Sequence, residues 1–218
     1  MPNFAPSTLI KADPEKPNSK ESKENNIFIY MTTAQLEEYA NSILTKTVGL
    51  YGSKMANKKL PKIIFCKPSI FNDITDPKDN ILLLLAEANL GLAIRDEWVK
   101  QFIKKHNLSD LYPDGTIFIF EKEVPQDENM ILSILCHELM HYFFHGIEND
   151  TDAGQGFNEA CTDYLAEQIF GENYITSYRQ SQQQNGYMEY YHKFMKGSEE
   201  YKRATLDLYM GISVENNN

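Results

Sequence analysis

The feature that most constrains this 218-residue chain is the run over residues 135–145, which carries a His-Glu-x-x-His pattern in an apolar stretch. His137 and His141 are four residues apart, so on a helix their imidazoles lie on one face, one turn apart, and can bind one metal ion. Glu138 then lies beside the open position of the metal, where a carboxylate can take up a proton and later return it. The pattern is typical of zinc hydrolases.

The surroundings of this pattern predict a buried helix. Apolar residues occur on nearly every side of it: Ile131, Leu132, Ile134, Leu135, Leu139, Met140, Phe143 and Phe144. Two histidines and a carboxylate in such a helix need partners, because unpaired polar groups are costly to bury. Core or solvated histidines that match the pattern by accident are the alternative. A bound metal satisfies all three groups at once and is the better interpretation.

A third ligand is expected from Glu159, which follows His141 by 18 residues. Asp163 comes four residues later, so both carboxylates lie on one side of a second helix, predicted over 157–170. Glu159 can reach the metal, and Asp163 can accept the outward N–H of a ligand histidine, His137 in our interpretation, which fixes its tautomer. Without the upstream histidines, the two acids would be interpreted as part of a solvated helix face.

The two segments resemble the gluzincin peptidases, in which a His-Glu-x-x-His helix is followed by a helix with Glu-x-x-x-Asp. The local match, Asn158-Glu159-Ala160-x-x-Asp163, is similar to the Asn-Glu-Ala-x-x-Asp of the thermolysin-like family. The resemblance implies that Glu159 is the third zinc ligand and that Asp163 orients a ligand. It covers only 135–170, with a connecting loop a little shorter than in thermolysin-like enzymes. The chain is too short for the large terminal domains of that family, so the resemblance extends to the site and not to the specificity.

Other residues compete for the third ligand position. Three acids lie in the loop between the two helices, where a side chain is held less rigidly than on a helix: Glu148, Asp150 and Asp152. His145 continues the spacing from His141, as a third histidine of the metzincin kind would. That arrangement needs a glycine turn after the second histidine, whereas residues 142–144 continue the helix here. We expect His145 to interact with the negative end of the helix, which is predicted to end near Gly146.

The whole chain predicts an α+β, zincin-like fold in which a small mixed sheet packs on the metal-binding helix and the C-terminal part is helical. Residues 1–26 are expected to be a disordered tail or targeting segment, and 27–218 a single domain. Strands are predicted at 27–31, 62–66 and 116–122. The last is the candidate for the edge strand that binds an extended peptide, with an ordinary core strand as the alternative.

Helices are predicted around these strands. Thr32 and Gln35 form a capping box that opens a helix. Its apolar face consists of Leu36, Ala40, Ile43, Leu44 and Val48. One or two helices are expected within 81–107, with a core stripe of Trp98, Val99, Phe102 and Ile103. Asp127 or Glu128 is expected to cap the metal-binding helix.

Peptide hydrolysis also needs a group that stabilises the oxyanion, and a tyrosine, histidine or arginine beside the metal commonly does so. The tyrosine-rich C-terminal region offers Tyr187, Tyr190, Tyr191 and His192, with Arg179 behind them. Packing against neighbouring residues is the alternative role of each of these side chains.

Charge and cysteine content narrow the partners and the compartment. A net charge of −10 argues against nucleic acid and anionic membranes, because binding either depends on basic patches. Cys66, Cys136 and Cys161 show no Cys-x-x-Cys spacing, so we expect no disulfide framework and synthesis in a reducing compartment. No apolar run fits a signal peptide or a membrane span, which favours a soluble cytoplasmic protein, with leaderless export as an open alternative.

The sequence thus predicts a zinc-dependent peptidase with one Zn²⁺ per chain and a peptide or protein as substrate. His137, His141 and Glu159 would bind the metal, Glu138 would be the general base and acid, and Asp163 would orient a ligand. One alternative is a catalytically idle, zinc-stabilised protein-interaction domain. Another is a leaderless secreted effector protease with one specific target. Cleavage specificity and oligomeric state stay open.

Overall fold

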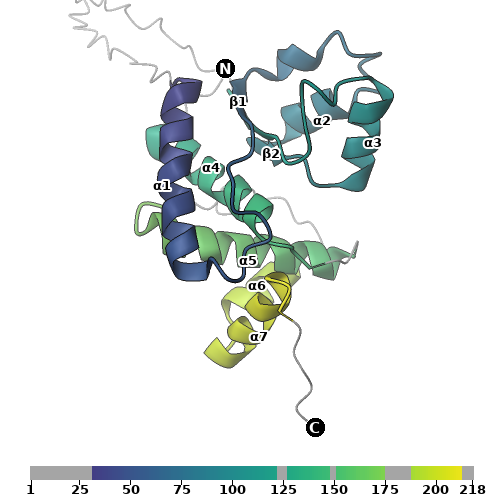
Figure 1. The fold of residues 1–218 in the computed structure, drawn as a ribbon. Helices are drawn as coiled ribbons and strands as arrows, with labels where there is room; N and C mark the ends of the chain where they lie inside the picture. Colours follow the sequence, from purple (N-terminus) through teal and green to yellow (C-terminus); the bar gives the residue numbers. More distant parts are fainter. Residues whose placement is uncertain (1–30, 122–126, 148–150, 175–187, 213–218) are drawn as a thin grey trace, which may run out of the picture.

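The computed structural model describes residues 31–121, 127–147, 151–174 and 188–212, and these combine α-helices with a small sheet (Figure 1). The elements are α1 (Thr33–Tyr51), β1 (Ile63–Cys66), the 3₁₀ helix η1 (Pro68–Phe71), α2 (Ile81–Ala88), β2 (Gly91–Ala93), α3 (Glu97–Lys105), β3 (Ile117–Phe120), α4 (Glu128–Phe143), α5 (Asp152–Phe170), α6 (Met188–Met195) and α7 (Glu199–Tyr209). The predicted mixture of helices and a small sheet is confirmed. The predicted tail at 1–26 and all but the last residue of the strand predicted at 27–31 lie outside the described residues.

The sheet has the strand order β1-β3-β2, with β1 parallel and β2 antiparallel to β3. All four residues of β3 are buried, because the strand is covered on both faces. Ile117 and Ile119 face the larger apolar core, which includes α1 and α4, whereas Phe118 and Phe120 face a second core formed with α2 and α3. The prediction that 116–122 forms an edge strand is therefore wrong, since β3 is the central strand. A strand that is apolar on both faces belongs inside a sheet.

The helix α1 begins as predicted. Thr32 accepts a hydrogen bond from the N–H of Gln35 at 3.3 Å, and the Gln35 side chain accepts from the N–H of Thr32 at 2.8 Å. The buried face differs from the prediction at one end, because Val48 is 43% exposed and Thr47 is buried instead. The Thr47 hydroxyl donates to the carbonyl of Ile43 at 2.8 Å, which satisfies this polar group inside the core.

The segment predicted to contain one or two helices contains two, α2 and α3, with the short strand β2 between them. Val99, Phe102 and Ile103 are buried, but Trp98 is 49% exposed and stands outside the core in which we expected it. Three residues of β2 are too few to show an alternating pattern in the sequence, so this strand was not predicted.

The helices α4 and α5 cross in the middle of the molecule (Figure 1). The N-terminus of α4 is capped by Asp127, whose carboxylate accepts from the N–H of Met130 at 2.7 Å, so the predicted acidic cap is confirmed. The second helix, α5, starts at Asp152, five residues before the predicted start, with Thr151 as its cap. Asn158 exchanges two hydrogen bonds with the backbone of Ile147, at 2.6 and 3.0 Å, which fixes α5 to the segment after α4.

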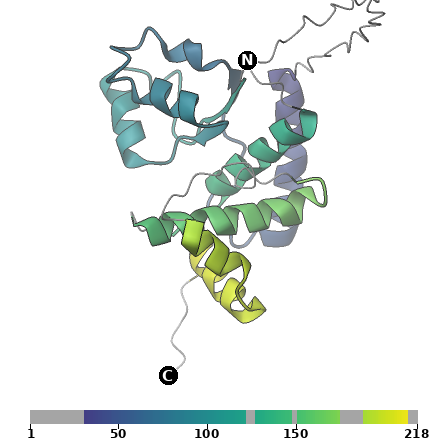
Figure 2. The ribbon, with the colours of Figure 1, turned by 180° about the vertical axis from the view of Figure 1, so that it is seen from behind.

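The two C-terminal helices cover α5 on the side away from the sheet. Both views show α6 and α7 at the end of the molecule opposite to α2 and α3 (Figure 2). The helix α6 packs along α5, and α7 contacts both α5 and α6. All three cysteines are free thiols, as predicted. None of the described helices is both long enough and apolar enough to cross a bilayer.

Candidate metal centre

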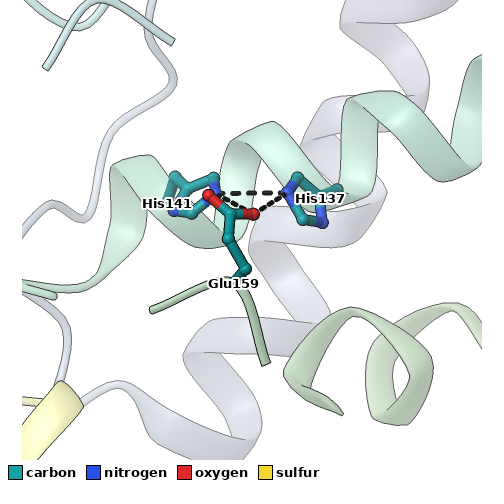
Figure 3. A group of neighbouring side chains, drawn as sticks. All are labelled: His137, His141 and Glu159. Atoms are coloured by element: carbon teal, nitrogen blue, oxygen red, sulfur yellow. Dashed lines mark hydrogen bonds and ion pairs between the residues drawn. The ribbon is translucent and has the colours of Figure 1, made fainter. Parts of the chain in front are cut away.

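The structure brings the three predicted metal ligands together at the crossing of α4 and α5 (Figure 3). On α4, the Nε2 atoms of His137 and His141 are 3.1 Å apart. From α5, Oε2 of Glu159 lies 3.1 Å from Nε2 of His137 and 3.3 Å from Nε2 of His141. Three ligand atoms of the predicted types therefore converge on one point.

These separations fit a divalent metal ion. Bonds of about 2.0 Å in a tetrahedral arrangement separate neighbouring ligand atoms by about 3.3 Å. The three observed separations, 3.1, 3.1 and 3.3 Å, are close to the edges of such a tetrahedron. Two imidazoles and one carboxylate would leave the fourth corner of the tetrahedron open to a water molecule or another small ligand.

The charges of the cluster are strongly coupled. Burial alone would raise the pKa of Glu159, but the two histidines outweigh it and hold the pKa well below its usual range. Burial alone would lower the pKa of His137, but its hydrogen bonds to Asp163 and Glu159 raise it well above the usual value. Glu159 therefore keeps its negative charge beside the two rings, as a ligand of a cation must.

Asp163 contacts His137, the histidine that it was expected to orient. Its Oδ1 lies 2.9 Å from Nδ1 of His137, and its side chain is fully buried. A carboxylate at this place holds the hydrogen on Nδ1, so the lone pair of Nε2 points toward the metal position.

His141 has a different partner, which sequence reasoning missed. Its Nδ1 lies 3.1 Å from the hydroxyl of Thr162 and 2.7 Å from Nη1 of Arg95. If Nε2 binds a metal, Nδ1 carries a hydrogen and needs an acceptor. Thr162 can accept, whereas the guanidinium of Arg95 can only donate. Thr162 follows Glu159 by three residues, so the helical spacing could have identified it. Arg95 follows the unpredicted strand β2, and no pattern in the sequence pointed to it.

Glu138 lies beside the ligands, where β2 approaches α4. The backbone N–H of Ala93 donates to its carboxylate, and burial raises the pKa of this carboxyl above its usual value. The approach is so close that a Cβ on Gly91 would lie 2.6 Å from Ile134 Cγ2 and 2.9 Å from Glu138 Oε1. Glycine at position 91 thus allows the strand to reach and orient the carboxylate.

The other ligand candidates lie elsewhere or outside the described residues. The helix α4 ends at Phe143, three residues before the predicted end near Gly146. His145 is exposed, with its ring against Gly211 rather than in the cluster. Glu148 and Asp150 lie outside the described residues. Asp152 is the first residue of α5, and its side chain is not among those described.

The described candidates for the oxyanion group, Tyr190, Tyr191 and His192, have different surroundings. Tyr187 and Arg179 fall outside the described residues. The ring of Tyr190 packs against Phe157, with 5.5 Å between centroids, and His192 is exposed. Tyr191 is buried, and its hydroxyl donates to Asp163 at 3.0 Å, which places this hydroxyl behind His137, away from Nε2.

No model of a known protein family matches the chain, and comparison with curated proteins and with solved structures also found no match.

Proposed function

We propose that this chain is a zinc-dependent peptidase of the gluzincin type with a zincin-like fold. One observation carries the proposal: three potential ligand atoms lie 3.1 to 3.3 Å apart, and a second carboxylate, that of Glu138, lies beside them and accepts a hydrogen bond from the N–H of Ala93. The sequence motifs around His137 and Glu159 add the resemblance to that family. The geometry and the motifs support the same chemistry.

A Zn²⁺ ion held by His137, His141 and Glu159 would polarise the substrate carbonyl and lower the pKa of a water molecule. Glu138 then takes the proton at its carboxylate, while the Ala93 N–H keeps that carboxylate oriented. Because burial raises the pKa of Glu138, the carboxyl can hold the proton and deliver it to the leaving nitrogen. The same side chain therefore acts first as base and then as acid.

The strand β2 is our candidate for the substrate-binding edge. It is an outer strand of the described sheet, and it adjoins both α4 and Glu138. An extended peptide can pair with such an edge through main-chain hydrogen bonds, which would bring a peptide bond next to the metal position. The substrate class that fits is a peptide or an unfolded protein segment.

Arg95 is our candidate for the group that stabilises the oxyanion. It follows β2, and within the part of the chain that the structure describes it forms no ion pair. With a metal on His141, Nδ1 of that ring carries a hydrogen and cannot accept from Arg95. Nη1 of Arg95 lies on the Nδ1 side of the ring, away from Nε2, so the guanidinium has to turn from this position toward the open corner to meet the developing negative charge on the carbonyl oxygen.

Arg95→Ala should lower kcat by about 100-fold, as the loss of one oxyanion donor does. Zinc content should stay unchanged, because Arg95 is not a ligand. Arg95→Lys, which keeps a positive charge without the fork of donors, should retain part of the activity. Steady-state kinetics with one cleaved peptide decide the matter, and a wild-type kcat in Arg95→Ala would show that another group stabilises the oxyanion.

The purified protein should bind about one zinc per chain and cleave members of a peptide library. A chelator should abolish cleavage, and added zinc should restore it. Metal analysis gives the stoichiometry and mass spectrometry of the library gives the cleavage sites. Absence of zinc after purification without chelator, together with no uptake on reconstitution, would refute the metal centre. Zinc binding with no cleavage of any peptide would favour the idle, zinc-stabilised interaction domain.

A further inference from the structure

The buried carboxylate of Asp163 lies behind the proposed metal centre. It accepts hydrogen bonds from three side chains, of which the ligand histidine is only one. Asp163 accepts from Nδ1 of His137 at 2.9 Å, from the hydroxyl of Tyr174 at 2.5 Å and from the hydroxyl of Tyr191 at 3.0 Å. A fully buried carboxylate is stable only when its oxygens are hydrogen-bonded. The two tyrosines therefore hold Asp163 in one orientation, and through it they orient His137.

The second ligand histidine has a matching support. Thr162 donates its hydroxyl hydrogen to the carbonyl of Asn158 at 2.7 Å. Its oxygen is thus free to accept from Nδ1 of His141, 3.1 Å away, and from the hydroxyl of Tyr209, 2.7 Å away. Tyr209 is fully buried, so this hydroxyl is held at one place by the core. The Tyr209 hydroxyl therefore fixes the rotamer of Thr162, whose oxygen accepts a hydrogen bond from the ring of His141.

The tyrosines come from the C-terminal part of the chain. Tyr174 follows α5, Tyr191 belongs to α6 and Tyr209 ends α7. Each ligand histidine of α4 is thereby connected through one residue of α5 to a hydroxyl on a C-terminal helix. The contact between Thr162 and Tyr209 spans 47 residues of sequence, and the contact between Asp163 and Tyr191 spans 28.

We infer that Tyr174, Tyr191 and Tyr209 are positioning residues of the metal centre, and that α6 and α7 form part of the metal-binding unit rather than a separate packing layer. The inference rests on the metal centre proposed above and not on peptidase activity. In physical terms, the hydroxyl groups of these tyrosines determine how tightly the two histidines of α4 bind the metal. Partners of this kind change metal affinity by about 10- to 100-fold when they are removed.

The test is the removal of single hydroxyls in the full chain. Tyr191→Phe and Tyr209→Phe should each weaken zinc binding about tenfold in competition with a chelator of known affinity. Tyr164→Phe is the matched control, because this tyrosine follows Asp163 on α5 but its ring packs against Phe194, with 5.9 Å between ring centroids. It should leave zinc affinity unchanged.

Double substitutions give a sharper result. Tyr191 and Tyr209 serve different histidines, so their effects should multiply to about 100-fold. Tyr174 and Tyr191 share Asp163, so the effects of Tyr174→Phe and Tyr191→Phe should not multiply. The visible spectrum of the Co²⁺-substituted protein should shift in the three single variants, because the ligand rings turn, and should not shift in Tyr164→Phe.

Hydrogen exchange of the wild-type protein provides the measurement that does not depend on variants. Amides of α6 and α7 should exchange more slowly with zinc than without it, since the metal fixes the rings to which these helices are connected. If the wild type binds zinc, but the tyrosine variants keep its affinity and cobalt spectrum, the inference is wrong and the metal centre stands. Equal exchange of α6 and α7 with and without zinc contradicts it as well. If the wild type binds no zinc, both proposals fail.

Discussion

Replacement of Glu138 by glutamine should remove peptide hydrolysis while leaving the metal and the fold in place. The amide cannot accept a proton, and the loss of a positioned general base costs about 100- to 10,000-fold in rate. Glutamine has nearly the same shape and keeps an oxygen for the N–H of Ala93, so the close approach of β2 should survive. The rate of cleavage and the zinc content, measured on the same sample, test both halves of the expectation.

Glu128→Gln is the matched control for this substitution. Glu128 lies in the first turn of the same helix, exposed and remote from the ligands, so the same chemical change there should leave activity intact. Loss of zinc in Glu138→Gln would show that Glu138 is a ligand and that its assignment as base is wrong. Unchanged cleavage would mean that the proton acceptor is another group.

The same pair of variants separates catalysis from an idle structural site. In a purely structural site the fourth position is filled by the protein, often by cysteine, and a carboxylate beside the metal has no purpose. Cys136 and Cys161 are buried but are not part of the cluster of His137, His141 and Glu159. The composition of the centre therefore favours the catalytic interpretation, which the kinetics of Glu138→Gln then test.

Local features of the sequence predicted the central part of the site. The spacing of His137 and His141, the cap at Asp127 and the spacing of Glu159 and Asp163 all lie within single helices, where 3.6 residues per turn determine which side chains share a face. We expected these residues to lie together, although they belong to two helices, because the ligands of one metal ion must be close to one another. The structure places these residues together as that reasoning expected.

The features that the sequence could not predict depend on contacts between distant segments. The residues of β3 indicate a strand, but its central place follows from pairing with both β1 and β2, and β2 is only three residues long. The role of Tyr209 depends on a contact with Thr162, 47 residues away, and the place of Arg95 on a contact with His141, 46 residues away. The alternation of apolar residues in a strand and their spacing in a helix carry no information on contacts between residues so far apart in the sequence.

Substitution of Glu159 should affect zinc binding more than substitution of any other acid in the region. Zinc in four-ligand sites is bound by about 10 to 16 kcal/mol, which is about 3 to 4 kcal/mol per ligand, so Glu159→Ala should weaken binding about 100- to 1,000-fold. The two imidazoles would remain, but the charge that balances the cation and the bond from α5 would both be lost. Competition with a zinc chelator measures the loss directly.

Four further variants test whether Glu159, and not another acid, is the third ligand. Asp163→Asn should weaken zinc binding or activity by about 10- to 100-fold, because Asp163 contacts His137 rather than the metal. Alanine at Glu148, Asp150 or Asp152 should leave zinc affinity nearly unchanged, because Glu159 already supplies the third ligand from α5 in the proposed site. A large loss at one of these three acids, with none at Glu159, would overturn the gluzincin assignment and leave a zinc protein with another third ligand. A large loss at Glu159, with none at these three acids, would show that α5 supplies the third ligand. The metal would then be connected, through Thr162 and Asp163, to the helices that follow α5.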